Sequence, residues 1–530
     1  MARKVTDGHD DSENRGEART CADKKARKNL EGRSIEVDAA GGGVPLKHVG
    51  SRNFQKINKA SVELTTQQIS MDSAKVINVK KPASTPSNST NTITSPVDPM
   101  ASFSPNGPKK MYLKDYNVLE EQVRECGNFH GFVCREDLPM MLPNKGDWLM
   151  RMSIHPVNPK KIKKPRANRK SEHEKATRSI VVSVHCKVDK TQKANSSSKI
   201  RSFVIWSDRG QFWMAHGTHF DKFHKMVDWA SNDYVAYKDA EFRLQREIQL
   251  LPWEFKHDDV ELLDTKLGEG AFGEVRIGKL TIQQRPKKTV VEVAVKMLKN
   301  ASEGISRDQI HELLHEARMM RILSHPNVLK VYGIAVLWEP PFLMTELCSC
   351  GALREYLKDN RETITLTEKL NFVMGAARGV EYIHSQKMIH RDLAVRNIFL
   401  TAEKMPKVSD FGLARQTDRY EMKEQCKIPV RYLAPETLEN YIFTPKTDVF
   451  SFGCVIWEIY ENGQQPFHGK NATVIRNQVR KREYLKLTAD APPELRKLVA
   501  ERIFVADPEN RCAMNAIVKI CETLAKVEKS

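Results

Sequence analysis

The sequence lacks paired cysteines. Its ten cysteines are scattered along 530 residues, no two of them form a CxxC pair, and none has the spacing of a metal-ligand set. The nearest two, Cys348 and Cys350, are too close together to clamp a zinc ion. We therefore expect free thiols in a reducing compartment, and the pattern argues against a disulfide-rich secreted protein.

Long apolar runs are also missing. No stretch approaches the roughly 20 apolar residues that span a bilayer. The start of the chain, Met1-Ala2-Arg3-Lys4, has neither the apolar core of a signal peptide nor the glycine at position 2 that myristoylation requires. We expect a soluble, cytoplasmic protein.

Aromatic side chains are scarce in the first 105 residues, where only Phe54 and Phe103 occur among many Ser, Thr, Asn, Asp and Lys residues. Such a segment cannot bury enough apolar surface to offset the entropy of ordering it. We predict that residues 1–105 are disordered. A solvated extension and a docking or phosphorylation tail are both open interpretations.

Acidic residues do not balance the basic ones: 85 Lys and Arg against 67 Asp and Glu give a formal charge of +18. An excess of this size suits nucleic acid, an anionic membrane surface or phosphorylated partners. No motif that reads nucleic acid is recognisable, so we expect no nucleic-acid partner. Much of the excess lies in residues 160–178, which carry nine basic and two acidic side chains. This segment is either a solvated insert or a source of attraction to phosphopeptides or anionic lipid.

What the chain does contain is a glycine-rich segment of the form GxGxxGxV. Its residues are Leu267, Gly268, Glu269, Gly270, Ala271, Phe272, Gly273, Glu274 and Val275. Glycines let a tight turn lie over phosphates and donate backbone N–H groups to them. The following segment Val293-Ala294-Val295-Lys296 has strand composition, whereas a dinucleotide-binding fold would open a helix at the glycines. Lys296 can therefore reach the α- and β-phosphates of a nucleotide from a strand.

A predicted helix over residues 307–323 carries Glu316 on the same face as Leu313 and Met320. A buried lysine needs an acidic partner to stay charged, and Glu316 is the candidate partner of Lys296. A lone helical glutamate is more often solvated. Its place between the lysine strand and His325-Pro326-Asn327 favours the paired interpretation.

The most specific signal is the octapeptide that runs from His390 to Asn397, HRDLAVRN, followed 13 residues later by Asp410-Phe411-Gly412. In such a set Asp392 orients a substrate hydroxyl and accepts its proton, while Asn397 and Asp410 hold magnesium. The segment closes at Ala434-Pro435-Glu436. A chance Asp-Phe-Gly is common, but the ordered set is highly specific for phosphoryl transfer.

With these motifs in place, residues 259–525 resemble the eukaryotic protein kinases. The resemblance implies a bilobal α+β domain, with a five-stranded sheet and one helix in the small lobe and a larger helical lobe. It also implies ATP and Mg²⁺ (or Mn²⁺) as cofactors. The resemblance assigns Asp448 to support of the catalytic loop and pairs Arg511 with Glu436. The adenine slot would be lined by Val275, Ala294, Thr345 as gatekeeper, Glu346, Cys348 and Phe399, where Phe399 stands in place of the usual leucine.

Two features are similar to the tyrosine-kinase pattern. Ala394 stands where serine/threonine kinases carry lysine, and Arg396 lies four positions after Asp392. The segment Lys427-Ile428-Pro429-Val430-Arg431-Tyr432 resembles the shelf that holds the phenol ring of a substrate. We predict protein tyrosine residues as substrates, and autophosphorylation at Tyr420 with Arg391 and Arg415 as partners of the phosphate. Aromatic or apolar residues replace the usual ones at four packing positions, which are Tyr432, Phe450, Phe504 and Cys512.

Residues 112–235 resemble an SH2 (Src-homology-2) domain, which implies a central antiparallel sheet flanked by two helices and phosphotyrosine-containing partners. Arg151, in Trp148-Leu149-Met150-Arg151, matches the strand arginine of that family, and Arg135 matches its helix arginine. We expect Ser153 to donate a hydrogen bond to phosphate oxygens. A buried guanidinium suits a phosphate dianion. Ser202 replaces the family's histidine, and residues 160–178 lengthen the following loop.

A linker is predicted over residues 236–258, with helical spacing in 237–251 and Trp253-Glu254-Phe255 after it. This order of parts looks similar to the Fes/Fer group of non-receptor tyrosine kinases. Three other interpretations stay open: a catalytically weak SH2 adaptor or scaffold, a serine/threonine kinase, and a nucleic-acid binder. The intact set Lys296, Asp392, Asn397 and Asp410 disfavours the first, and Ala394 with Arg396 disfavours the second.

Overall fold

The computed structural model describes residues 113–154, 178–188, 199–214, 218–237, 240–270, 273–284, 287–298, 305–422 and 428–527. The predicted disordered segment 1–105 and all of the basic insert except Arg178 lie outside these ranges. Within them, no helix combines the length and apolar character needed to cross a membrane.

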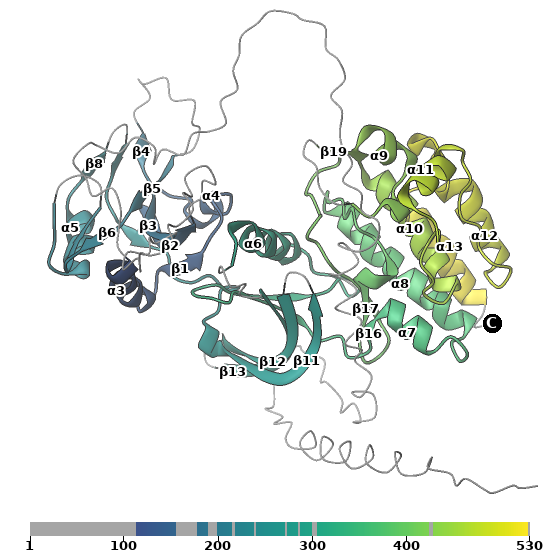
Figure 1. Cartoon of the computed structure of the whole chain (residues 1–530), viewed down its shortest axis with the longest axis horizontal. Coiled ribbons are helices and arrows are strands. Elements are labelled where there is room, and N and C mark those ends of the chain that lie inside the picture. Colours follow the sequence, from purple (N-terminus) through teal and green to yellow (C-terminus); the bar gives the residue numbers. More distant parts are fainter. Residues whose placement is uncertain are drawn as a thin grey trace, which may run out of the picture. The chain divides into compact units, whose positions relative to one another are not determined.

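The first region, residues 113–247, is built on a sheet with the strand order β1-β2-β3-β5 and with β10 beside β2. β1 and β10 run parallel to β2, while the β2–β3 and β3–β5 pairs are antiparallel. The elements are α3 (Leu113–Arg124), β1 (Phe129–Phe132), α4 (Leu138–Met141), β2 (Asp147–Ile154), β3 (Arg178–His185), β4 (Lys187–Val188), β5 (Ile200–Val204), β6 (Trp206–Asp208), β7 (Gln211–Trp213), α5 (Phe223–Asn232), β8 (Val235–Tyr237), β9 (Ala240–Phe242) and β10 (Arg246–Glu247). Figure 1 draws them in blue to teal.

Strand β2 has a side-chain period of two that separates its two faces. Trp148, Met150 and Met152 enter the large core to which α3 and α5 also contribute. Leu149 belongs to a smaller cluster on the other face. Arg151 therefore points away from the large core, on the face of the sheet opposite to it.

The predicted linker helix over residues 237–251 is wrong. The described residues 235–237, 240–242 and 246–247 form the short strands β8, β9 and β10, and β10 pairs with Asp147 and Trp148 of β2. Ala240, Phe242 and Leu244 are all buried, which is the alternation of a strand rather than of a helix. The first region thus continues past the predicted boundary at residue 235.

The second region, residues 260–527, begins with an antiparallel sheet in the order β11-β12-β13-β15-β14 and helix α6. Its first elements are β11 (Val260–Gly270), β12 (Gly273–Gln284), β13 (Lys287–Leu298), α6 (Arg307–Arg321), β14 (Val331–Ala335) and β15 (Phe342–Glu346). Ser306 caps α6 by accepting a hydrogen bond from the N–H of Gln309, whose side chain returns one to the Ser306 N–H. The predicted five-stranded sheet and the predicted helix over 307–323 are both confirmed.

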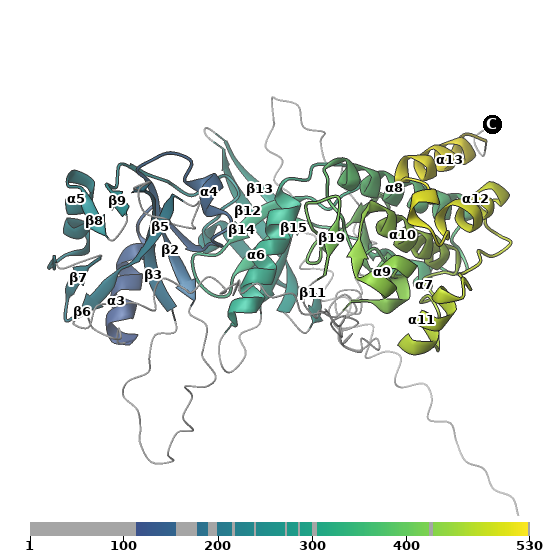
Figure 2. The same ribbon diagram turned by 90° about the horizontal axis from the view of Figure 1, so that it is seen from above.

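The remainder of the second region is helical. It comprises β16 (Gly351–Ala352), α7 (Leu353–Asp359), α8 (Leu366–Ser385), η5 (Val395–Asn397), β17 (Ile398–Leu400), β18 (Pro406–Val408), β19 (Tyr420–Glu421), η6 (Val430–Tyr432), α9 (Pro435–Asn440), β20 (Ile442–Phe443), α10 (Pro445–Tyr460), α11 (Ala472–Arg480), α12 (Pro493–Leu498), η7 (Val499–Ile503), η8 (Pro508–Asn510) and α13 (Met514–Val527). Helices α8, α10 and α13 lie together in both views (Figures 1 and 2), and α8 contacts both of the others. The same two views show α6 running beside the sheet. A sheet-rich part followed by a mainly helical part is the bilobal arrangement that the resemblance to the protein kinases implied.

Candidate active site

The glycine-rich segment lies at the turn between β11 and β12, where Gly268 pairs with Val275 and Gly270 pairs with Gly273. A Cβ atom at Gly273 would lie 1.9 Å from the carbonyl oxygen of Met297 on β13, so no other residue fits there. Ala271 and Phe272, two of the predicted nucleotide-binding residues, lie outside the described residues. The strand pairing places this hairpin turn beside Lys296, whose register partner is Val275.

Lys296 on β13 and Glu316 on α6 form the predicted ion pair, with 2.6 Å between Nζ and Oε2. Burial by itself lowers the pKa of Lys296, but the carboxylates of Glu316 and Asp410 outweigh it and the pKa is raised. Lys296 therefore stays charged, as the predicted contact with nucleotide phosphates would need.

Asp392 is held from two sides within the catalytic loop. Its Oδ1 accepts a hydrogen bond of 2.6 Å from Arg396, and its Oδ2 accepts one of 2.8 Å from Nδ2 of Asn397. All three side chains are buried. The carboxylate is thus fixed by charge-assisted hydrogen bonds, an arrangement that would suit a proton acceptor because it needs little reorganisation.

Asn397 and Asp410 fit a divalent cation. The Oδ1 of Asn397 is buried and has no hydrogen-bond partner, although its Nδ2 is fully used. Asp410, at a left-handed φ of 62°, has a pKa of about 7, raised by burial and by Glu316 against the opposing effect of Lys296. The described residues contain no cluster of three or more His, Cys, Asp or Glu that would hold a metal by itself. Mg²⁺ usually takes one or two protein oxygens and completes its shell with phosphates and water, which matches this pair.

Helix α10 supports the catalytic loop through two buried carboxylates. Asp448 accepts hydrogen bonds from the backbone N–H groups of His390 (2.8 Å) and Arg391 (2.9 Å), as the resemblance implied. Glu458, which the sequence did not single out, accepts one from the N–H of Val395 (3.0 Å). Glu458 also accepts one from the hydroxyl of Tyr432 (2.9 Å), so it joins the loop to the segment before α9. Its pKa is raised to about 7 by burial.

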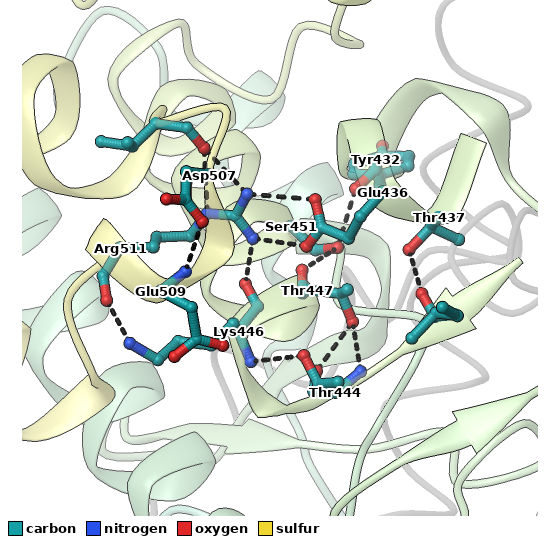
Figure 3. Close-up of polar contacts among 12 residues, drawn as sticks. Tyr432, Glu436, Thr437, Thr444, Lys446, Thr447, Ser451, Asp507, Glu509 and Arg511 are labelled. Atoms are coloured by element: carbon teal, nitrogen blue, oxygen red, sulfur yellow. Dashed lines mark hydrogen bonds and ion pairs between the residues drawn. The ribbon is translucent and has the colours of Figure 1, made fainter. Parts of the chain in front are cut away.

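The predicted pair of Arg511 and Glu436 is confirmed and is shown in Figure 3. The guanidinium of Arg511 makes contacts of 2.8 and 3.2 Å with the two carboxylate oxygens, and it also donates to the carbonyl of Lys446 at 2.7 Å. In the same view, Ser451 of α10 donates to the carbonyl of Tyr432. These contacts fix the segment 430–436 against α10.

Tyr420 pairs with Phe443 through the β19–β20 ladder. The guanidinium carbons of the two predicted cation partners lie close to its ring centre, Arg391 at 4.3 Å and Arg415 at 5.4 Å. Arg415 also contacts Nε2 of His315 on α6 at 2.8 Å, a link that the sequence did not indicate. Tyr420 therefore lies between cations that connect onward to α6.

The residues predicted to hold adenine come from two sheets, the five-stranded sheet and the three-stranded sheet β16-β17-β18, and from the segment after β15. Ala294 of β13 is the register partner of Thr345 on β15, and Phe399 lies on β17 opposite Ala352. Cys348 is buried in the segment after β15, and burial raises the pKa of its thiol. Glu346 pairs with Lys407 at 2.9 Å.

In the first region, Arg151 on β2 is almost fully buried and contacts hydroxyls instead of carboxylates. Its Nε donates to Oγ of Ser183 (3.0 Å) and its Nη2 to Oγ of Ser202 (3.3 Å). Burial, and then the charge of Arg135, lower its pKa to about 10. Arg135 lies in the turn before α4 and not in a helix, which corrects that detail of the match. Ser153, two positions after Arg151 on the same strand face, is half-buried.

Comparisons with known proteins agree with this geometry. A family model described as "Protein tyrosine and serine/threonine kinase" matches residues 262–521. The chain is 30% identical over 415 residues to Fer-related kinase 1 from Caenorhabditis elegans, which covers 78% of this chain and 96% of that protein. It is 28% identical to Spermatocyte protein spe-8 from Caenorhabditis briggsae, over 76% of this chain and 71% of that protein. It is also 28% identical to human tyrosine-protein kinase Fer, over 76% of this chain and 44% of that protein.

Proposed function

This chain belongs to the protein tyrosine kinases, and from that premise we propose that it transfers the γ-phosphoryl group of ATP to tyrosine hydroxyls of proteins. Asp392 orients the hydroxyl and accepts its proton, while Arg396 and Asn397 keep the carboxylate in place. Lys296, held by Glu316, neutralises the α- and β-phosphates. Asn397 and Asp410 would hold Mg²⁺, which would supply positive charge to the phosphates.

Tyrosine is the proposed acceptor because of the residues around Asp392. Ala394 leaves no lysine two positions after Asp392, and Arg396 contacts the catalytic carboxylate directly. The guanidinium of Arg396 also lies 5.1 Å from the ring centre of Tyr432, at the end of the segment that resembles the shelf for a phenol ring. A phenol carries its hydroxyl further from the backbone than serine does, so the shelf has to hold the peptide further out.

The observation that carries the proposal is the buried Asp392 carboxylate between Arg396 and Asn397. The test is purified chain with Mg-ATP and a mixed library of tyrosine and serine peptides, beside Asp392→Asn. We expect phosphate on tyrosine and a loss of about 10²- to 10⁴-fold in the variant, the range for general-base catalysis. Phosphate on serine, or none above the variant, would favour a serine/threonine kinase or a catalytically weak adaptor instead.

We propose separately that the first region is an SH2 domain that binds phosphotyrosine. The support is Arg151, a buried guanidinium with no described carboxylate bonded to it, next to two serine hydroxyls. Titrating a phosphotyrosine peptide library against the chain and Arg151→Met tests this proposal. Equal affinity in the two proteins would refute it.

Tyr420 is the proposed activating autophosphorylation site, because Arg391 and Arg415 lie against its ring and could pair with a phosphate on its hydroxyl. Unchanged activity and phosphotyrosine content in Tyr420→Phe would refute that role.

We further propose that the chain acts in the cytoplasm and that residues 160–178 give peripheral contact with anionic membranes. Deletion of 160–178 without loss of liposome binding would contradict the membrane contact.

A further inference from the structure

Tyr234 stands out among the tyrosines whose side chains the structure describes, because it is the one that is exposed. Its side chain is 54% exposed, whereas the others are buried or half-buried. It lies between the end of α5 and the start of β8, in the first region. A tyrosine kinase can modify only a hydroxyl that reaches its active site, so its exposure makes Tyr234 a further candidate in the described part of the chain, beside the half-buried Tyr420.

Two cations face the Tyr234 ring from separate segments. Nζ of Lys145, in the turn before β2, lies 6.0 Å from the ring centre, and the guanidinium carbon of Arg243, after β9, lies 5.8 Å from it. Neither cation forms an ion pair with any described carboxylate, and the Nε of Arg243 is buried without a hydrogen-bond partner. Two positive charges therefore converge on one neutral ring.

An ordinary cation–π contact explains only part of this arrangement. A single exposed contact of this kind contributes about 0.5–1 kcal/mol, and the second cation adds repulsion from the first. A phosphate on the Tyr234 hydroxyl would carry a charge of about −1.5 to −2 at neutral pH, which would balance both cations. Lys145 is exposed and its long side chain is free to swing toward a phosphate oxygen, while Arg243 offers an unused N–H.

We propose that Tyr234 is a phosphorylation site of this kinase and that Lys145 and Arg243 form the receptor for its phosphate. In the reaction the bond between the β,γ-bridging oxygen and the γ-phosphorus of ATP breaks, and a bond from the Tyr234 oxygen to that phosphorus forms. ADP leaves with the electron pair of the broken bond, and the phenolic proton passes to Asp392. The modification rests on the proposed function, whereas the receptor does not.

The receptor connects two segments that already pair with each other. The carbonyl of Gly146, next to Lys145, accepts hydrogen bonds from the N–H groups of Gln245 (3.0 Å) and Arg246 (3.1 Å). Asp147 and Arg246 add a two-pronged ion pair at 2.7 Å. A phosphate held by Lys145 and Arg243 would tie the same two segments together once more. It would therefore stabilise the strand β10 by which the chain leaves the first region.

The modification is tested by incubating the full chain with Mg-ATP and a tyrosine peptide, then mapping phosphosites by mass spectrometry. We expect Tyr234 phosphate in the wild type and none in Asp392→Asn, with Tyr234→Phe phosphorylating the peptide normally. A phosphorylated peptide with no phosphate on Tyr234 would overturn the modification. An unphosphorylated peptide would instead refute the kinase function, and the receptor would then be decided by the second experiment alone.

The second experiment installs phosphotyrosine at position 234 genetically and measures amide hydrogen exchange. We expect exchange in residues 144–148 and 243–248 to slow by about tenfold, the effect of one new charge-assisted hydrogen bond. Lys145→Gln with Arg243→Gln should abolish the slowing. Lys225→Gln is the matched control, because Lys225 is an exposed cation of the same region that is already paired with Asp221. Unchanged exchange on phosphorylation, or equal slowing in the double variant, would overturn the receptor.

Discussion

Arg396 in the second region and Arg151 in the first are both buried guanidinium groups on the two proposed phosphate-handling sites, yet their partners differ. Arg396 contacts the carboxylate of Asp392 at 2.6 Å, and that charge outweighs the effect of burial, so its pKa is raised. Arg151 contacts two serine hydroxyls and a carbonyl, and burial lowers its pKa to about 10. The charge of Arg396 is compensated by a bonded carboxylate, whereas no described carboxylate bonds to Arg151, which suits the proposed binding of phosphotyrosine.

The comparison explains why each site has its own chemistry. A catalytic loop must hold its carboxylate still through the reaction, so its cation is committed to that carboxylate. A binding pocket gains most when the incoming anion meets a desolvated cation that no internal carboxylate has neutralised. The same residue type therefore contacts a carboxylate in one region and hydroxyls in the other, in line with the two proposed roles of positioning and recognition.

The largest expected effect comes from making the same change, arginine to methionine, at both positions. Arg396→Met leaves Asp392 buried without its cation, which should cost about 3–5 kcal/mol of local stability. Arg151→Met removes a buried charge that has no carboxylate partner, so the cost should be about 1 kcal/mol or less. Local stability is read from hydrogen exchange of the catalytic-loop amides and of the β2 amides, respectively. Equal costs at the two positions would break the comparison.

The next largest expected effect is on the free energy of unfolding, and it compares two arginine–carboxylate pairs, Arg511 with Glu436 and Arg246 with Asp147. Arg511 is fully buried against Glu436, whereas the Arg246 side chain is 57% exposed against Asp147. We expect Arg511→Gln to cost about 3 kcal/mol, because a carboxylate and two carbonyls lose their donor in a buried site. Arg246→Gln should cost about 1 kcal/mol, since its pair is open to solvent and Asp147 keeps the N–H of Asn144. Urea unfolding followed by signals from each region measures both changes, and a larger loss for Arg246→Gln would contradict the ranking.

Kinase activity should depend on pH near neutrality because of the raised pKa of Asp410. Asp410 has a pKa of about 7 and faces Lys296, Glu316, Asp392 and Arg396. An acid with a raised pKa is neutral below that value, so Asp410 loses its charge, and its hold on a cation, as the pH falls through 7. We expect kcat/KM for Mg-ATP to fall about tenfold per pH unit below 7, with a smaller change in kcat because bound cation keeps the carboxylate ionised. Glu458 titrates in the same range, so Glu458→Gln is the control. An acid limb that vanishes in Glu458→Gln would assign the effect to Glu458 instead.

Motif order and the resemblance to the protein kinases together predicted much of the catalytic site. Lys296 pairs with Glu316 as the order of the motifs predicted. The hydrogen bonds of Asp448 to the loop and the pair of Arg511 with Glu436 lie as the resemblance implied, between residues far apart in the chain. Glu458 was missed because a glutamate at the end of an apolar helix carries no motif, and only the fold brings it to Val395 and Tyr432. A charged residue directly after Val455-Ile456-Trp457 was the one available signal.

The first region was predicted less well, for a physical reason. Strands of two or three residues, such as β9 and β10, hold too few side chains to show a period. The register of β10 is set by β2, about a hundred residues earlier, and β9 pairs with β4 and β8. The mixed charges in 237–251 also have the spacing of the polar face of a helix, which is why a helix was predicted there. Arg151 was found because it matches the strand arginine of the SH2 family, while the contact of Ser183 with it depended on the β2–β3 register.

The smallest expected effect on activity tests whether the hydrogen bonds of Glu458 to Tyr432 and Val395 let the substrate shelf, the segment before α9, help to position the catalytic loop. Tyr432→Phe removes one hydroxyl and leaves an oxygen of Glu458 without its donor, which should cost about 1 kcal/mol, or roughly fivefold in rate. If the Tyr432 hydroxyl positions the shelf for a peptide, the loss falls on KM for the peptide and leaves KM for ATP unchanged. Tyr484→Phe is the matched control, because the Tyr484 hydroxyl is buried with no hydrogen-bond partner and its removal should cost nothing. Equal kcat and KM values for the two variants would show that Arg396 and Asn397 are sufficient to hold Asp392, and that the shelf does not help to position the loop.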